Sequence, residues 1–248
     1  MNIVNRIHHI APVINSASPL VLANCRVFID FDNTITTSDV LDDLIKRFSI
    51  NNQWEQLEKA WRDGKIGTKE CLDGQLRNVR VNKNTLHNFL RKVELDPYFH
   101  KLLALLVKEG IKPVILSDNF TYIIEKILQY QGIKDLKVYG NSLRFWREHL
   151  IPSFPYDNPF CLTCAHCKKI HLTKDRTENK LIVFIGDGRS DFCPARVSDI
   201  VFAKDSLLRF MINEELPYIA YKNLGHIHDY FEGALTHNHK QHKETILK

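Results

Sequence analysis

Three short apolar segments of the chain stop abruptly at clusters of polar residues. The segments are Val27–Ile29, Ile111–Leu116 and Leu181–Ile185. Short apolar runs bounded by polar turn residues are typical of strands that are buried on both faces, as in a parallel sheet. Ligands bind at the edge where the carboxyl ends of parallel strands meet. The polar residues that follow each segment are therefore the first candidates for a functional site.

A different pattern fills the stretch between Thr36 and Asp96. Its apolar residues recur every three or four positions, which indicates helices. Four groups of such positions are present: Val40, Leu41, Leu44, Ile45 and Phe48; Trp54, Leu57 and Trp61; Leu72, Leu76 and Val79; and Leu86, Phe89, Leu90 and Val93. The pattern predicts an inserted segment of four helices at 37–95, with the aromatic residues in its core.

Strands that alternate with helical patterns predict an α/β fold. We expect a three-layer, Rossmann-like core with a parallel sheet, formed by residues 24–36 and 96–225 and interrupted by the helical segment at 37–95. Residues 1–23 are expected to form an N-terminal arm. Residues 226–248 are expected to form a His-rich C-terminal tail with a frayed, solvated end. Loose metal binding is an alternative role for three histidines of this tail, His237, His239 and His242.

Composition limits the classes of protein to which the chain can belong. With 248 residues, 44% of them hydrophobic, it can bury one sizeable core and a small appended unit. The net charge of +5, with basic and acidic residues interspersed, suits an anionic metabolite rather than a nucleic acid. No apolar run approaches the ~20 residues that span a membrane. Six cysteines without a secretion signal indicate the cytoplasm, and the sequence leaves monomer and homodimer open.

Asp30 and Asp32 follow the first apolar segment and lie two residues apart. Side chains alternate along a strand, so the two carboxyl groups start on the same side. Two acids at this spacing repel each other unless a cation or a division of acid and base roles keeps them together. The pair predicts a metal-assisted nucleophile, although acidic residues also occur in ordinary turns after strands.

The second apolar segment ends in residues that suit a phosphate group. Ser117, Asp118 and Asn119 follow it and precede a helical pattern. A hydroxyl group and the amides of a helix N-terminus can meet a phosphate at such a point. Further along the chain, either Lys168 or Lys169 could supply a positive charge. That charge would bind a phosphate and offset the negative charge of a nucleophilic carboxylate.

The third apolar segment ends in a turn that carries two more acids. The sequence there is Gly186-Asp187-Gly188-Arg189-Ser190-Asp191. Its glycines permit a tight turn, and Asp187 and Asp191 bring further carboxylates to the same expected edge. Carboxylate oxygens are ligands that Mg²⁺ prefers.

The ordered set D-x-D-x-T, Ser, Lys and G-D-G-x-x-D resembles the four motifs of the haloacid dehalogenase superfamily of aspartate-nucleophile phosphatases, in order and in spacing. The resemblance covers residues 26 to 215 and makes the helical segment a cap of the C1 type, inserted after the first motif. It implies that Asp30 is the nucleophile that becomes an aspartyl phosphate. It also implies that Asp32 protonates the leaving oxygen and then activates water.

The same resemblance assigns the residues that bind phosphate and metal. Ser117 and Lys168 would hold the phosphate, together with Asp118. Lys168 is preferred to Lys169 because related members place this lysine directly after a cysteine. The ligands of Mg²⁺ would be Asp30, the carbonyl group of Asp32, and Asp187, with Asp191 supporting them from a second layer.

Some positions depart from the commonest pattern of the superfamily. Asn33 replaces a frequent glycine, and Asp118 and Asn119 replace small residues. Neither change removes a reacting group, but both bear on the shape of the phosphate pocket and of the substrate entrance. The presence of Asp32 argues against the dehalogenase branch, which does not need an acid to protonate the leaving group. Hydrolysis of a phosphate ester is therefore favoured.

A cysteine-rich segment precedes Lys168. Three cysteines with C-x₂-C-x₂-C spacing and nearby histidines could provide the ligands of a structural Zn²⁺ ion. A disulfide and free thiols are the alternatives. The candidate ligands are Cys161, Cys164, Cys167, His166 and His171.

The cysteine-rich segment and the run Pro194–Lys204 resemble a narrower branch of the superfamily. That branch contains the phosphatases of the methionine-salvage enol phosphate, with phosphocholine and pyridoxal phosphate phosphatases as relatives. The implied substrate is 2-hydroxy-3-keto-5-methylthiopentenyl-1-phosphate, and phosphoserine is a further alternative. Asp39, Arg77 and Arg80 of the cap could contact the substrate. A different class, a zinc-stabilised binding protein without catalytic activity, is disfavoured by the complete set of reacting residues.

Overall fold

The computed structural model describes residues 24–158, 164–177 and 180–246, with side chains described as far as Leu235. The predicted N-terminal arm and Cys161 lie outside the described residues, as do the side chains of the tail histidines. The described chain divides into two compact units. The first contains the described residues up to Ile29, Asp96–Pro113 and those from Leu172 onward. The second contains Asp30–Leu95 and the described residues of Val114–His171.

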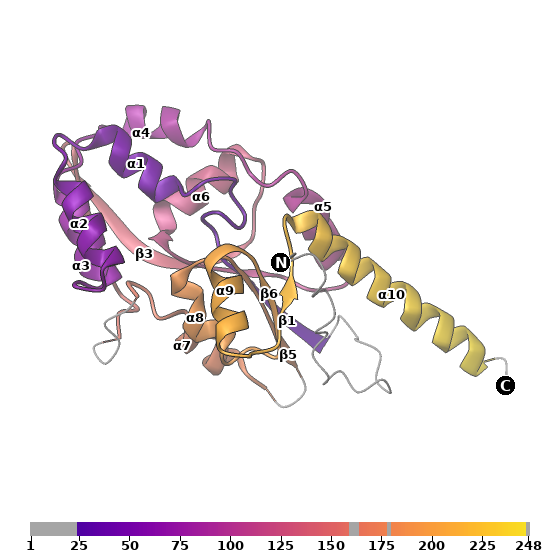
Figure 1. Cartoon of the computed structure of the whole chain (residues 1–248). Coiled ribbons are helices and arrows are strands. Elements are labelled where there is room, and N and C mark those ends of the chain that lie inside the picture. The colour runs from indigo at the N-terminus through magenta and orange to yellow at the C-terminus, as the bar shows by residue number, and fades with distance from the viewer. Residues whose placement is uncertain (1–23, 159–163, 178–179, 247–248) are drawn as a thin grey trace. The chain divides into compact units, whose positions relative to one another are not determined.

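Four parallel strands lie side by side in the first unit, in the order β1-β5-β6-β7 (Figure 1). They are β1 (Cys25–Ile29), β5 (Leu181–Gly186), β6 (Ile200–Ala203) and β7 (Ile219–Ala220). Side chains from β1 and β5, including Phe28, Ile29, Val183 and Phe184, have no exposed surface. The first and third apolar segments of the sequence therefore form buried parallel strands, as predicted.

The helices of the first unit include a long one at the C-terminus. They are α5 (Phe99–Lys108), α8 (Phe192–Ala195), α9 (Asp205–Asn213) and α10 (Leu224–Ile246), with a 3₁₀ helix at Arg189–Asp191. α10 packs against α5 and buries Leu224, Ile227 and Phe231, which recur at helical spacing. The residues that were expected to form a frayed tail are therefore helical as far as Ile246, because this apolar face starts the helix.

The second unit holds the other three strands. They are β2 (Val114–Phe120), β3 (Lys137–Trp146) and β4 (His149–Ser153), with β2 parallel to β3 and β3 antiparallel to β4. The helix α6 (Thr121–Tyr130) packs on β2 and β3. The pairing of β2 with β3 shifts register between Leu116 and Phe120. The predicted strand thus continues beyond Leu116 through a bulge.

Four helices occupy the segment where the sequence predicts four. They are α1 (Val40–Phe48), α2 (Gln53–Arg62), α3 (Thr68–Arg77) and α4 (Lys83–Leu90). They do not form a unit by themselves, because α3 packs on β4 and α4 packs on α6 within the second unit (Figure 1). The ring of His87 on α4 is hydrogen-bonded to the hydroxyl group of Tyr122 on α6 at 2.7 Å.

These strands and helices confirm the predicted α/β class, with strands that are mostly parallel. One more helix, α7 (Lys168–Asp175), begins in the second unit and ends in the first. None of the helices in the described ranges combines the length and the apolar character needed to cross a membrane.

Candidate active site

A buried ion pair joins Asp30 and Lys168 within the second unit. Asp30 directly follows β1, and Lys168 is the first residue of α7. The Lys168 Nζ atom lies 2.5 Å from Asp30 Oδ1, and the two residues expose 1% and 6% of their surface. A buried ammonium group requires a partner of opposite charge. The neighbouring Lys169 is exposed, so the structure brings Lys168, and not Lys169, to the predicted nucleophile.

Asp32 is held by hydrogen bonds from three directions. Its Oδ1 atom accepts the backbone N–H of Val40 at 2.9 Å. The side-chain amide of Asn119 donates to Oδ1 at 3.2 Å and to Oδ2 at 3.0 Å. The hydroxyl group of Ser117 lies 3.4 Å from Oδ2, where it can donate a weak hydrogen bond. The half-buried carboxyl group therefore has a fixed orientation.

The surroundings of Asp32 favour its protonated form. Desolvation and the charge of Asp39 raise the pKa of Asp32 to about 8, against the opposing effects of Asn119, Val40 and Lys168. Desolvation also raises the pKa of Asp39 to about 6. A carboxyl group with a pKa near neutrality can give and take a proton in one catalytic cycle. The surroundings of Asp32 are thus compatible with the acid and base role expected for it from the sequence.

The bulge in β2 positions Ser117 and Asn119. Bulges redirect side chains and are frequent beside active sites. The Ser117 hydroxyl accepts the backbone N–H of Asn119 at 3.0 Å, which closes a local turn. Gly140 on β3 makes room for this turn, because a Cβ atom there would lie 2.7 Å from the Asn119 carbonyl oxygen.

Asn33 adopts a left-handed backbone conformation, with a φ angle of 55°. Glycine adopts this conformation freely, and asparagine is one of the few other residues that tolerate it. The departure from the commoner glycine therefore leaves the backbone of the first motif able to turn. Asn33 N–H donates to the Ser38 carbonyl oxygen at 3.2 Å, which closes the loop before α1.

Asp187 and Asp191 shape a tight loop in the first unit. The Oδ2 atom of Asp191 accepts the backbone N–H groups of Asp187 and Gly188 at 2.9 and 3.0 Å. The Asp187 carbonyl oxygen accepts the N–H of Leu207 at 2.7 Å. Both acids are buried, at 8% and 0% exposed surface. Asp191 thus holds the backbone of the loop that presents Asp187.

The histidines of the cysteine-rich segment contact each other. The Nε2 atoms of His166 and His171 lie 2.8 Å apart. The ring of Tyr156 contacts both, at a tilt against His166 and edge-on against His171. Burial, His171 and Lys168 lower the pKa of His166 to about 3. Cys164 and Cys167 are buried, with 7% and 6% exposed surface. Among the described residues, no set of three or more ligand atoms within 4.8 Å of one another includes any of these four side chains.

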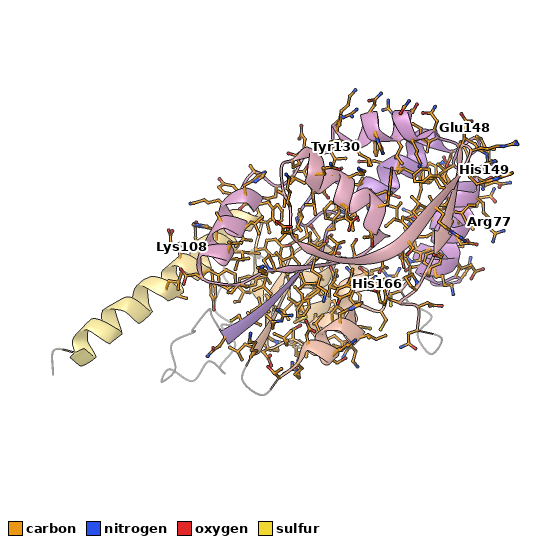
Figure 2. All side chains as sticks on the ribbon, turned by 180° about the vertical axis from the view of Figure 1, so that it is seen from behind. Arg77, Lys108, Tyr130, Glu148, His149 and His166 are labelled. Atoms are coloured by element: carbon orange, nitrogen blue, oxygen red, sulfur yellow. The ribbon has the colours of Figure 1, made fainter. Side chains whose placement is uncertain are left out.

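The remaining predicted residues have contacts of their own. The Asp118 carboxylate accepts the Ala165 N–H at 3.4 Å, and Asp39 caps α1 by accepting the Asp42 N–H at 2.9 Å. Arg77 pairs with Asp73 at 2.7 Å and lies beside His149, away from His166 (Figure 2). Arg80 donates to the Arg77 and Val79 carbonyl oxygens.

Asn119 is the residue of this site whose role the sequence did not indicate. In the sequence, Asn119 stands out only as a departure from the small residues common at this position. Its side chain is 99% buried and contacts an acid 87 positions away along the chain. The sequence signal is an amide side chain directly after Ser117 and Asp118 at the end of an apolar run, which is too general to assign a contact.

Together, the fold and these contacts define a phosphatase of the haloacid dehalogenase type, with a carboxylate paired to a lysine beside a second, protonatable carboxyl group. The chain belongs to the family described as "Putative Phosphatase", whose model matches residues 25–217. The family resemblance and the enzyme class expected from the motifs are thereby confirmed.

Curated relatives match most of the chain. A protein of Exiguobacterium sibiricum named 2-hydroxy-3-keto-5-methylthiopentenyl-1-phosphate phosphatase is 26% identical over 211 residues, which cover 84% of this chain and 96% of the relative. A protein of the same name from Microcystis aeruginosa is 25% identical over 207 residues, with 82% and 96% coverage.

Solved structures support the fold. A phosphoserine phosphatase captured as an analogue of its phospho-aspartyl intermediate has a TM-score of 0.64 at 16% identity and covers 84% of this chain and 98% of its own. A probable phosphoserine phosphatase from Vibrio cholerae has a TM-score of 0.66 at 16% identity, with 88% and 68% coverage.

Proposed function

We propose that this chain hydrolyses a small phosphomonoester with the help of Mg²⁺, through an aspartyl phosphate on Asp30. The observation that carries the proposal is the contact set of one unit, in which Lys168 meets Asp30 and hydrogen bonds fix the carboxyl group of Asp32. The proposed substrate is the methionine-salvage enol phosphate, because relatives at 22–26% identity are named 2-hydroxy-3-keto-5-methylthiopentenyl-1-phosphate phosphatase.

The proposed reaction has two steps. A carboxylate oxygen of Asp30 attacks phosphorus, the ester bond breaks, and the proton of Asp32 moves to the leaving oxygen. Asp32 then takes a proton from the water that attacks the aspartyl phosphate, which releases inorganic phosphate and restores Asp30. Lys168 and Ser117 would hold the phosphoryl oxygens, and the amide of Asp118 would assist them.

The donor set fits Mg²⁺, since carboxylate and carbonyl oxygens are hard ligands that this ion prefers. Asp30, the Asp32 carbonyl group and Asp187 would bind it, and Asp191 would keep the Asp187 loop in place. When bound, the ion would supply positive charge that stabilises the phosphoryl oxygens.

Three variants test this proposal. Asp30→Asn should abolish turnover of 4-nitrophenyl phosphate while leaving the circular dichroism spectrum unchanged, because an amide cannot attack phosphorus. Lys168→Ala should lower kcat/KM by about 10²–10³, the usual cost of losing one charge-stabilising donor. The exposed Lys169→Ala is its matched control and should behave as wild type. Wild-type turnover by Asp30→Asn would disprove the proposed nucleophile.

Comparison of kcat/KM among small phosphate esters tests the substrate. The panel consists of the methionine-salvage enol phosphate, phosphocholine, pyridoxal phosphate and phosphoserine. The enol phosphate is expected to give the highest value. Asp39, Arg77 and Arg80 stay proposed substrate contacts, and charge-removing variants that change the ranking within the panel would support them.

A structural zinc ion is a separate proposal that rests on the cysteine spacing. Its ligands would be Cys161, Cys164, Cys167 and one of the two histidines. Protein purified without chelator should then contain about one equivalent of zinc by elemental analysis. Metal-free protein with reduced thiols and full activity would count against the ion and would favour the hydrogen-bonded histidine pair as a packing feature.

A further inference from the structure

We infer that Asn119 is a positioning residue that orients Asp32 for proton transfer to the leaving group, an inference that rests on the proposed function. The Asn119 side chain has 1% exposed surface and donates to both oxygens of Asp32. Within the proposed reacting set, the hydrogen bonds of the Asn119 side chain go to Asp32, whereas its backbone N–H donates to the Ser117 hydroxyl group. Its contribution therefore acts through Asp32.

The orientation of the Asn119 amide is fixed by the backbone. Its Oδ1 atom accepts the N–H of Phe120 at 2.6 Å. A backbone N–H can only donate, so the oxygen must face Phe120 and the NH₂ group must face Asp32. The Ser117 hydroxyl, which accepts the Asn119 N–H, and the close approach permitted by Gly140 fix the backbone of Asn119 from the other side.

The same donors distinguish the two oxygens of Asp32. Oδ1 accepts a backbone N–H from Val40 and an amide N–H from Asn119, neither of which can rotate away. Oδ2 faces Asn119 and the rotatable hydroxyl group of Ser117. A protonated carboxyl group in this setting keeps Oδ1 as its acceptor oxygen, so the transferable proton belongs on Oδ2.

This arrangement assigns the path of the proton. A bond forms between an Asp30 oxygen and phosphorus, and the bond from phosphorus to the ester oxygen breaks with its electron pair on that oxygen. The proton on Asp32 Oδ2 moves to the same oxygen, which leaves as an alcohol and leaves Asp32 as a carboxylate. Without Asn119 the carboxyl group would keep one fixed donor, Val40, and could rotate about it.

Two phosphate esters of similar size separate this role from a structural one. The leaving group of benzyl phosphate is a basic alkoxide that needs a proton, whereas that of 4-nitrophenyl phosphate departs as a stable anion. The ratio kcat/KM reports steps up to leaving-group departure. Asn119→Ala should lower it by about 10² for benzyl phosphate, as loss of general acid catalysis does, and by less than about tenfold for 4-nitrophenyl phosphate.

Asn119→Asp is the second variant, because it keeps the shape of the side chain and the acceptor for Phe120 but loses the donor. It should show the same selective loss. Asn141→Ala is the matched control. Asn141 is also fully buried and donates to the same segment, at the Asp118 carbonyl oxygen, but has no contact with Asp32 in the described structure. Its effect should be equal for the two esters.

The outcomes are distinct. A selective loss in the Asn119 variants, absent in Asn141→Ala, supports the inference. An equal loss of kcat/KM for both esters overturns the inference but leaves the proposed function standing. Failure of both Asn119 variants to fold has the same consequence, because it would give Asn119 a purely structural role. Wild-type protein inactive on both esters, or an active Asp30→Asn, would instead overturn the proposed function and the inference with it.

Discussion

Gly186 and Gly188 flank Asp187 and provide a sharp test of how the loop is built. A Cβ atom at Gly186 would lie 2.7 Å from Asp191 Cγ, closer still to Asp191 Oδ2, and 2.9 Å from Phe184 Cε1. At Gly188 the nearest atom would be Asp191 Oδ2 at 4.0 Å, which is an ordinary van der Waals contact. The two substitutions Gly186→Ala and Gly188→Ala therefore add the same methyl group to different surroundings.

The expected magnitudes follow from these contacts. Gly186→Ala must displace the buried Asp191 carboxylate, and overpacking of a core costs about 1–3 kcal/mol. If Asp191 also loses the N–H groups of Asp187 and Gly188, each hydrogen bond to a charged acceptor adds about 1.5–3 kcal/mol. Overpacking alone should therefore lower the free energy of unfolding by about 1–3 kcal/mol, and loss of one of the two hydrogen bonds would raise the cost to about 2.5–6 kcal/mol. Gly188 has a φ angle of −106°, which alanine adopts, so Gly188→Ala should change stability by less than about 1 kcal/mol.

Urea denaturation followed by circular dichroism measures both free energies. Phosphatase activity should fall with Gly186→Ala, because the displaced Asp191 no longer holds the Asp187 loop, and raising the Mg²⁺ concentration should restore part of it. Gly188→Ala should keep activity. Equal stability of the two variants would refute the reasoning, since it would mean that the Asp191 carboxylate moves aside without cost.

Two further predictions concern stability away from the reacting groups. Asp96, at 8% exposed surface, accepts the N–H of Tyr98 at 2.9 Å and that of Leu224 at 3.0 Å. Asp96→Ala should therefore lower the free energy of unfolding, measured by urea denaturation, by about 2–4 kcal/mol. A loss below about 0.5 kcal/mol would contradict this bridge between α5 and α10. Burial, followed by the charges of Glu58, Asp42 and Glu70, raises the pKa of Cys71 from 9.0 to about 12. Above pH 9 the thiol ionises in the unfolded chain while the folded chain keeps its proton. The free energy of unfolding of the wild type should therefore fall with rising pH more steeply than that of Cys71→Ala, by up to about 1.4 kcal/mol per pH unit. The same pH dependence of stability in both proteins would disprove this prediction.

The pattern of apolar residues predicted the strands that are buried on both faces of the sheet. Phe28 and Ile29 of β1 and Val183 and Phe184 of β5 have no exposed surface, and such strands appear in a sequence as uninterrupted apolar runs. The four helices between 37 and 95 were equally visible from their apolar spacing, although only α1, α3 and α4 bury side chains and α2 buries none. In both cases the pattern is local, so no knowledge of the packing partner was needed.

Features that depend on a distant partner were not visible. The bulge in β2 arises from its pairing with β3 and from the close approach at Gly140, neither of which the local sequence encodes. The helix at the C-terminus was not predicted, because the segment after Tyr230 is mostly polar. The buried apolar positions that begin the helix, Leu224, Ile227 and Phe231, are few. The choice of Lys168 over Lys169 came from family resemblance, and only the folded chain shows which lysine reaches Asp30.

The two asparagines that depart from the commonest motif pattern act in different ways. Asn33 keeps what a glycine would supply, because its φ angle of 55° is open to both residues. Asn119 adds what a small residue cannot supply, a buried amide that donates to both oxygens of Asp32. Asn33 thus leaves the backbone conformation of the first motif as a glycine would allow it, whereas Asn119 adds hydrogen bonds to Asp32. A leaving group that is difficult to expel gains most from such support, since a firmly oriented proton matters only where the departing oxygen needs one.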